Sequence, residues 1–238
     1  MKRENSIDEA KRKAALQAVK HVKNNFVVGL GSGTTAAYAI KEIGKKIKRE
    51  KIRVLAIPTS YQAFNLAIEQ GIPLTTLEEY PTLDLTIDGA DQIDNELNMI
   101  KGMGGALSRE KIVASASKEL IIIADKTKKV EFLGENNHPI PIEVLTFAVP
   151  TVTSRIREIK GKPILRESNK KVGPVITDNG NVIIDANFGL VHEPSKLECN
   201  LKRIPGVVET GLFIEMADLA YLGEQSIRKK SKRKQESS

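Results

Sequence analysis

The sequence predicts an α/β fold in which a doubly wound, mainly parallel sheet is joined to a smaller α+β second domain. Three observations predict it. Up to about residue 130, short apolar runs alternate with segments whose apolar residues recur at helical spacing, as in strands connected by helices. The run at 120–124 (LIIIA) is apolar at every position, which is typical of a parallel strand buried on both faces. Beyond residue 131, prolines punctuate shorter segments and the alternation stops.

The elements of the first part follow one another in a regular order. Segments with apolar residues at helical spacing predict helices at 7–22, 35–47, 61–70 and 107–117. Short apolar runs predict strands at 26–30, 54–57, 83–87 and 120–124. Because strands and helices alternate, the strands are expected to run in parallel.

The second part has a different pattern. Strand, helix, hairpin, helix and strand follow within 131–205, which predicts a small α+β domain of ferredoxin-like type. The hairpin is expected at 174–186, where Asn179 and Gly180 can adopt the positive φ angles of its tight turn. A helix is expected from about Pro194 to the residue before Pro205.

The last strand-like runs, within 206–223, are expected to return to the main sheet. The predicted domains are therefore 1–130 with 206–227 for the α/β part, 131–205 for the small domain, and a basic tail at 228–238.

The excess positive charge is confined to that tail. The formal net charge is +7, and 228–238 (RKKSKRKQESS) holds six basic residues and one Glu, a net charge of +5, so the remainder carries only +2. A basic run without apolar residues predicts a solvated, disordered end. With no Trp and 4% aromatic residues, the sequence argues against a nucleic-acid partner.

Composition excludes several other classes of protein. The 238 residues are 40% hydrophobic and 28% charged, which supports a packed core and excludes wholesale disorder. No apolar run approaches the ~18 to 20 residues that cross a bilayer, and the N-terminus (MKRENSIDEAKRK) is charged where a signal peptide is apolar. The single Cys199 excludes an internal disulfide framework. A cytoplasmic protein without a membrane partner is expected.

The first segment that can carry chemistry is GLGSGTT, at 29–35, between a predicted strand and helix. Its glycines allow backbone N–H groups to approach an anion at the helix N-terminus, and Ser32, Thr34 and Thr35 add hydroxyl donors. It is not a Walker A loop, and Thr34 occupies the third glycine position of the dinucleotide fingerprint. A phosphate site and a plain turn both remain open.

The second segment is TIDGADQID, at 86–94, directly after a predicted strand. Asp88, Asp91 and Asp94 recur at three-residue spacing, so a helical turn would group them on one face. Carboxylates at the carboxyl end of a parallel strand lie where α/β proteins bind ligands. The alternating order of a calcium loop is missing, and a solvated acidic turn is the alternative.

The third segment is KGMGGALSREK, at 101–111. Lys101, beside three glycines, can bring its ammonium and backbone amides to a substrate oxygen, and Glu110 follows in the predicted helix. Read alone, the segment is equally a glycine-rich turn before an ordinary helix. Three such turns after successive strands favour a small phosphorylated polyol over a dinucleotide, because hydroxyls, carboxylates, a lysine and a glutamate would share one sheet edge.

These segments, followed by IADKTKKV, PIPIEVLTFA, VITDNGNVIIDA and IPGVVETGLF, resemble in this order the type A ribose-5-phosphate isomerases. The resemblance covers nearly the whole chain before the tail. It implies interconversion of D-ribose 5-phosphate and D-ribulose 5-phosphate through an enediol(ate), in the non-oxidative branch of the pentose phosphate pathway, with no metal or other cofactor. It also implies a parallel α/β sheet with a smaller α+β domain, and a homo-oligomer, either a dimer or a tetramer.

The resemblance further implies roles for individual residues. It places the general base at Glu110, the acidic pair at Asp88 and Asp91, and the active-site lysine at Lys101. The substrate-binding residues that it implies are Ser32, Gly33, Thr34, Thr35, Asp88, Gly89, Ala90, Asp91, Lys101, Gly102, Met103, Gly104 and Lys128. Lys11 aligns with a phosphate-contacting lysine. Met103 interrupts a run that is often consecutive glycines, and the basic tail has no counterpart.

Three other functions are alternatives to the isomerase reaction. A sugar-phosphate sensor on the same fold would not need Lys101 and Glu110 together, and the short segment before the first strand leaves no room for a DNA-binding module. An NAD(P)-dependent dehydrogenase is disfavoured because 57–60 (IPTS) lacks the acidic residue that holds a ribose diol. A related sugar-phosphate isomerase or deaminase remains the nearest enzymatic alternative, because a fold does not determine the chemistry.

Overall fold

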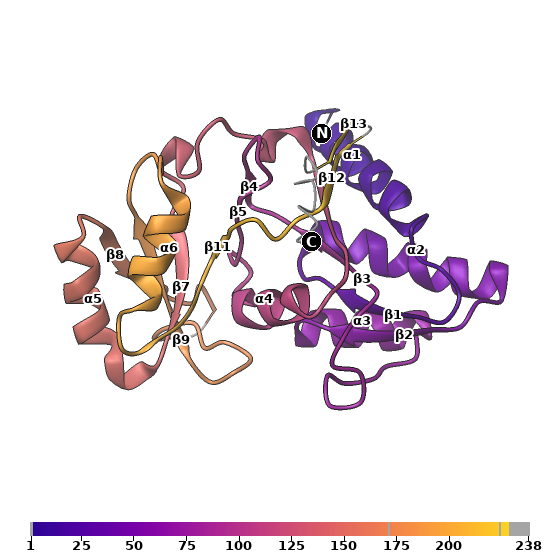
Figure 1. Cartoon of the computed structure of the whole chain (residues 1–238), viewed down its shortest axis with the longest axis horizontal. Coiled ribbons are helices and arrows are strands. Elements are labelled where there is room, and N and C mark those ends of the chain that lie inside the picture. The colour runs from indigo at the N-terminus through magenta and orange to yellow at the C-terminus, as the bar shows by residue number, and fades with distance from the viewer. Residues whose placement is uncertain (1, 171, 224, 229–238) are drawn as a thin grey trace, which may run out of the picture.

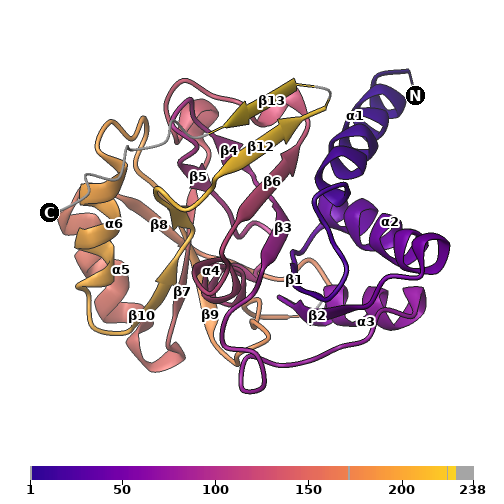
Figure 2. The same cartoon turned by 45° about the vertical axis from the view of Figure 1, so that its right-hand side comes forward.

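The main sheet of the computed structural model, which describes residues 2–170, 172–223 and 225–228, has six strands (Figures 1 and 2). In sheet order these are β13 (Gln225–Arg228), β12 (Leu219–Leu222), β6 (Leu120–Ala124), β3 (Leu85–Gly89), β1 (Phe26–Leu30) and β2 (Val54–Pro58). Neighbouring strands pair in parallel, except that β12 and β13 are antiparallel. The mainly parallel sheet predicted from the sequence is confirmed.

Helices pack on both faces of this sheet. On one face lie α1 (Lys2–Val19), α2 (Thr34–Glu50) and α3 (Tyr61–Gln70), as Figure 2 shows, and on the other lies α4 (Leu107–Ser115). Ile121 and Ile123 of β6 pack toward α1 and α2, whereas Leu120 and Ile122 pack on the opposite face with Phe213. Side chains of a strand alternate between faces, which is why this strand is apolar throughout. No helix in the described ranges is long and apolar enough to span a membrane.

A small antiparallel sheet lies beside α4, in the order β11 (Leu212–Phe213), β5 (Met99–Ile100) and β4 (Gln92–Ile93). The acidic segment therefore runs from β3 into β4 through a bend at Asp91 and contains no helical turn. The expectation that a helical turn groups Asp88, Asp91 and Asp94 on one face is wrong. Asp88 lies in β3, Asp91 at a bend before β4, and Asp94 at the start of the β4–β5 turn, so the three carboxylates have different surroundings.

The second domain surrounds a four-stranded antiparallel sheet in the order β10-β7-β9-β8, on the left of Figure 1. Its elements are β7 (Ile140–Val144), α5 (Val149–Glu158), β8 (Lys162–Leu165), β9 (Val182–Asn187), α6 (Pro194–Lys202) and β10 (Val207–Thr210). This is the β-α-β-β-α-β order of a ferredoxin-like unit. Its own apolar core includes Ile142, Val152, Ile156 and Ile184.

One local expectation is confirmed only in part, and another is wrong. The first part of 206–223 does not return to the main sheet, because Val207–Thr210 pairs with β7 of the small sheet and only β12 enters the main one. In the hairpin turn, Gly180 has a φ of 81°, but Asn179 is not among the residues with positive φ. The turn closes through Gly180 N–H donating to Thr177 O at 2.9 Å and Thr177 N–H donating to Asn181 O at 2.8 Å.

The expected basic tail lies mostly outside the described residues. Arg228, its first residue, is the last residue of β13, so the tail proper begins one residue later than the composition indicates. The described residues also contain short 3₁₀ helices at Lys126–Lys128, Glu135–Asn137 and Thr146–Ala148.

Candidate active site

The loops that follow β1, β3, β5 and β6 meet at one edge of the main sheet and enclose a cavity. This is the edge formed by the carboxyl ends of the parallel strands, where α/β sheets bind ligands. The cavity is lined by Lys11, Ser32, Gly33, Thr34, Thr35, Gly89, Ala90, Asp91, Lys101, Gly102, Gly104, Glu110 and Lys128. The structure thus brings the three segments singled out in the sequence into one site.

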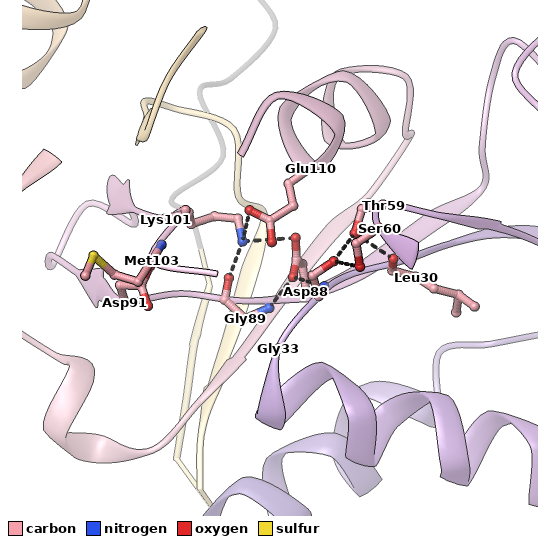
Figure 3. A network of polar contacts seen from close by, with 12 residues as sticks. Leu30, Gly33, Thr59, Ser60, Asp88, Gly89, Asp91, Lys101, Met103 and Glu110 are labelled. Carbon is pink, nitrogen blue, oxygen red and sulfur yellow. Dashed lines mark hydrogen bonds and ion pairs between the residues drawn. The ribbon is translucent and has the colours of Figure 1, made fainter. Parts of the chain in front are cut away.

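Lys101 lies at the centre of the polar contacts (Figure 3). Its Nζ is 3.0 Å from Asp88 Oδ2 and 3.2 Å from Glu110 Oε2, and it donates to Gly89 O at 2.7 Å. The side chain is buried and its Nζ lies 5.3 Å from the centre of the Phe213 ring. Burial lowers the pKa of Lys101, but the carboxylates of Asp88 and Glu110 outweigh it and keep the pKa above its ordinary value. The ammonium therefore stays charged.

Glu110 points from the first turn of α4 into the same cluster (Figure 3). Burial, followed by the like charge of Asp88, raises the pKa of Glu110 to about 8 against the opposing effect of Lys101. Its Oε2 is buried and accepts no hydrogen bond within the described residues, although Lys101 Nζ is 3.2 Å away. A carboxylate that lines the cavity and has a pKa near neutral is suited to take a proton from a ligand.

Asp88 lies behind the cavity and does not line it. This carboxylate is 1% exposed; its Oδ1 accepts the N–H groups of Ser32 at 3.1 Å and Gly89 at 2.7 Å, while Oδ2 faces Lys101. A Cβ at Gly31 would lie 2.0 Å from Asp88 Oδ1, so this position needs glycine for the loop to approach the carboxylate. Asp88 therefore links the GLGSGTT loop to Lys101.

The two later aspartates have different surroundings. Asp91 lines the cavity, and its Oδ2 accepts the backbone N–H of Met103 at 3.0 Å. Asp94 is not part of the lining; its Oδ1 accepts the N–H groups of Glu96 and Asn98 at 2.8 Å, which closes the β4–β5 turn. Of the three regularly spaced carboxylates, Asp94 is structural.

The opposite end of the cavity is suited to an anion. Thr34 and Thr35 occupy the N-terminus of α2, where unpaired N–H groups and the helix dipole favour negative charge. Lys11 and Lys128 line the same cavity, and Lys11 Nζ is 3.4 Å from Thr34 Oγ1. Lys128 is placed there by a 3₁₀ turn whose N-cap Asp125 accepts the Thr127 N–H at 2.9 Å.

Two hydroxyl residues of the site were not singled out in the sequence. Ser32 Oγ lies 2.8 Å from Thr59 Oγ1 and 2.5 Å from Ser60 Oγ, both after β2 (Figure 3). Ser60 is the N-cap of α3 and accepts the Ala63 N–H at 3.2 Å. Its capping role could be inferred from a Ser that directly precedes a helical pattern, but its contact with Ser32 depends on the pairing of β1 and β2.

Met103, like Asp88, is a predicted binding residue that does not line the cavity. It is 41% exposed, whereas its backbone N–H reaches Asp91. No group of three or more His, Cys, Asp or Glu side chains arranged to hold a metal ion is found within the part of the chain that the structure describes.

Fold and site together define an α/β protein with a buried acid–lysine centre beside an anion pocket. The sequence pattern of the family described as ribose 5-phosphate isomerase A (phosphoriboisomerase A) matches residues 55–227. Ribose-5-phosphate isomerase A of Methanosarcina acetivorans is 48% identical over 215 residues, which cover 90% of each chain. The human ribose-5-phosphate isomerase is 46% identical over 92% of this chain and 71% of its own length.

Solved structures agree with these sequence relatives. Ribose 5-phosphate isomerase A from Methanocaldococcus jannaschii superposes with a TM-score of 0.89 at 42% identity, over 92% of this chain and 98% of that one. A D-ribose-5-phosphate isomerase in complex with phospho-erythronic acid superposes with a TM-score of 0.90 at 41% identity, over 93% and 99%. This chain belongs to the ribose 5-phosphate isomerase A family.

Proposed function

We propose that this chain is an aldose–ketose isomerase that interconverts D-ribose 5-phosphate and D-ribulose 5-phosphate. The observation that carries the proposal is the Glu110–Lys101–Asp88 cluster, which lies in one cavity with the Thr34–Thr35 helix terminus. Relatives that are 46% to 48% identical and named for this reaction support it. The reaction would place the enzyme in the non-oxidative branch of the pentose phosphate pathway.

Glu110 is the proton shuttle in this proposal. In the open-chain aldose it takes the proton from C2, and the electrons of that C–H bond form an enediolate across C1 and C2. Glu110 then returns the proton to C1 while the hydroxyl proton of O2 passes to O1, which yields the ketose without change in composition. The place of Glu110 in the cavity lining and its raised pKa support this role.

Lys101 stabilises the charge that develops on the substrate oxygens. Its ammonium is held by three oxygen partners and buried, so it needs little reorganisation as the enediolate forms. Lowering the energy of the enediolate relative to the substrate accelerates the reaction.

The positions of the two aspartates favour a division of roles. Asp91 faces the cavity and is placed to open the sugar ring and to exchange hydroxyl protons. Asp88 holds Lys101 and raises the pKa of Glu110 from behind the cavity. The sequence leaves the division of roles between the two aspartates open, and these positions favour Asp91 over Asp88 for ring opening.

The phosphate is bound by the α2 end of the site, with Lys11 and Lys128 as its cationic partners. Binding energy from this remote group positions the sugar carbons next to Glu110. Inorganic phosphate is accordingly expected to inhibit in competition with substrate.

The test is isomerisation of ribose 5-phosphate by the purified chain, treated with EDTA and supplied with no cofactor. Glu110→Gln removes the base and keeps the shape, and should lower turnover by at least ~10²-fold, since general bases contribute ~10²- to 10⁴-fold. Glu158→Gln, at an exposed ion pair with Arg155, is the matched control and should leave turnover unchanged. Near-normal turnover of a folded Glu110→Gln variant would overturn the assignment of the base.

We also propose a cytoplasmic homo-oligomer, a dimer or a tetramer. Apolar side chains exposed on the small domain support an assembly: Ile164, on the edge strand β8, is 69% exposed, and Phe147 is 100% exposed. Exposed apolar groups and sheet edges are commonly covered in assemblies. Light scattering that gives a 26.2 kDa particle at all concentrations would contradict the assembly, and cell fractionation would test the location.

A further inference from the structure

A residue of the second domain donates hydrogen bonds to the loop that carries Lys101. Arg166, which directly follows β8, is largely buried, its side chain being 13% exposed. Its Nη1 donates to the carbonyl oxygens of Gly102 at 3.1 Å and Met103 at 2.9 Å. A single guanidinium nitrogen therefore holds two consecutive peptide units directly beside the catalytic lysine.

All five N–H groups of this guanidinium have partners. Two belong to Nη1 and reach the loop carbonyls. Nε and Nη2 donate to the two carboxylate oxygens of Asp185 on β9, at 2.7 and 2.5 Å, and Nη2 also approaches Met103 Sδ at 3.9 Å. An arginine has five donors in a fixed fork, so none is left for a ligand. Arg166 is also not part of the cavity lining.

The hydrogen bonds from Arg166 to the two carbonyl groups determine where the N–H groups of the same peptide units point. In a trans peptide the C=O and the N–H of the same unit point in opposite directions, and the described chain contains no cis peptide bond. The Met103 N–H, opposite the Gly102 carbonyl, donates to Asp91 at 3.0 Å. The Gly104 N–H is opposite the Met103 carbonyl and therefore points away from Arg166. Gly104 lines the cavity, and no described residue accepts a hydrogen bond from its N–H.

The loop needs such an external contact because its sequence is flexible. Gly102 has a φ of 99° and Gly105 a φ of 82°, within a stretch that contains three glycines. Glycine has more backbone freedom to lose on folding than any other residue. The loop's own closure is a single bond from Gly105 N–H to Gly102 O at 2.9 Å, so contacts from outside the loop are needed to order it.

We propose that Arg166 is a positioning residue for isomerisation: by holding the carbonyls of Gly102 and Met103, it keeps the Gly104 N–H directed at an oxygen of the reacting sugar. It also keeps Lys101, the first residue of the loop, in place opposite Glu110. Asp185 fixes the guanidinium in turn. The role rests on the proposed isomerase function, and Arg166 acts through the loop without contacting the substrate.

The test compares Arg166→Gln and Arg166→Lys with the wild-type chain. Both variants lose the fork that joins Asp185 to two carbonyls, so kcat should fall by about 10- to 100-fold, the order expected when reacting groups are misplaced by ~1 Å. KM should stay within about threefold, because the α2 and lysine contacts to phosphate are untouched. Lysine keeps the charge but not the geometry, so it should not restore kcat.

Two ligands distinguish a positioning role of Arg166 from a general loss of structure. Phospho-erythronic acid carries a carboxylate that resembles the enediolate, and its affinity measured by calorimetry should fall by about the same factor as kcat, because it uses the contacts of the transition state. The affinity for inorganic phosphate, which occupies only the anion end, should be unchanged. Equal loss for both ligands, or a kcat within about threefold of wild type in a folded variant, would overturn the proposal.

Controls cover folding and function separately. Arg155→Gln removes an exposed arginine of the same domain and should change neither kcat nor ligand affinity. If the Arg166 variants do not fold, Asp185→Asn loosens the same fork and should shift the two affinities in the same unequal way. If the wild-type chain shows no isomerase activity, the proposed function fails, while calorimetry of the two ligands still tests the role of Arg166.

Discussion

Replacing Asp88 by Asn tests whether the buried cluster controls the proton affinity of Glu110. The two carboxylates flank one ammonium, at 3.0 and 3.2 Å, so their facing oxygens are at most about 6 Å apart. Two like charges at that separation repel by about 2 to 3 kcal/mol at an effective dielectric constant of ~20. That energy corresponds to about two pKa units. Asp88→Asn removes this repulsion and leaves Lys101 to pair with Glu110 alone, so the pKa of Glu110 should fall from about 8 by roughly that amount.

The assay is kcat/KM as a function of pH. A base must be ionised to act, so wild-type kcat/KM should rise with pH and level off above about 8. In Asp88→Asn the rise should occur about two pH units lower, with a smaller plateau because a weaker base and a less firmly held Lys101 remain. The substrate phosphate, which titrates near pH ~6, contributes equally in every variant.

Asp94→Asn is the matched control, because Asp94 lies in the same segment but bonds only within the β4–β5 turn. Its profile should coincide with that of the wild type. A folded Asp88→Asn variant whose profile stays in place, or moves to higher pH, would refute the coupling of Asp88 to Glu110.

Two further predictions concern stability. Because folding raises the pKa of Glu110, the charge of this residue should destabilise the wild-type chain increasingly as pH rises from about 4.5 to about 8. In urea unfolding, Glu110→Gln should therefore be the more stable protein at pH values above 8, and the difference should vanish below about 4.5. An equal difference in stability at all pH values would contradict this. Glu143 is fully buried and accepts hydrogen bonds from Ser108, Thr177, Asn179 and Asn181. Glu143→Ala leaves these donors unpaired and should lower the free energy of unfolding by at least about 3 kcal/mol, whereas Glu193→Ala, at an exposed ion pair, should have little effect.

Helix α4, which carries Glu110, depends on the second domain for its position. In α4, Ser108 bonds to Glu143, Arg109 donates to Asn179 Oδ1 at 2.8 Å, and Lys111 pairs with Glu198 at 2.8 Å and Glu209 at 3.0 Å. Glu110, between them, is the one that turns toward Lys101. Figure 1 shows α4 between the two domains. The small domain therefore orients the proposed base although it does not line the cavity.

Several of the longer local elements were determined by the sequence on its own. The strand at 26–30, the helix at 61–70 and the strand at 120–124 have in the structure the bounds that their patterns predict. These patterns are reliable because each element buries one face or both against a large core, so apolar periodicity records the burial directly. Glycine and proline positions likewise mark the turns, since their backbone preferences are local.

The sequence predicted the candidate site only in part. The order of the three turns and their resemblance to a known family identified Lys101, Glu110 and Asp91 as residues of one site. The sequence did not indicate β4, β5 and β11, because strands of two residues show no periodicity. Without them, the spacing alone did not distinguish Asp88, Asp91 and Asp94; the family resemblance set the first two apart.

Tertiary structure decided what distinguishes these side chains. Asp88 lies behind Lys101 because β3 pairs with β1, and Arg166 reaches the loop because the second domain folds back against α4. The raised pKa of Glu110 arises from burial and from a carboxylate twenty-two positions away in the chain. Sequence periodicity reports which face of a segment is buried, whereas proton affinity and loop geometry depend on which segments meet across the core, and that is settled only when the whole chain packs.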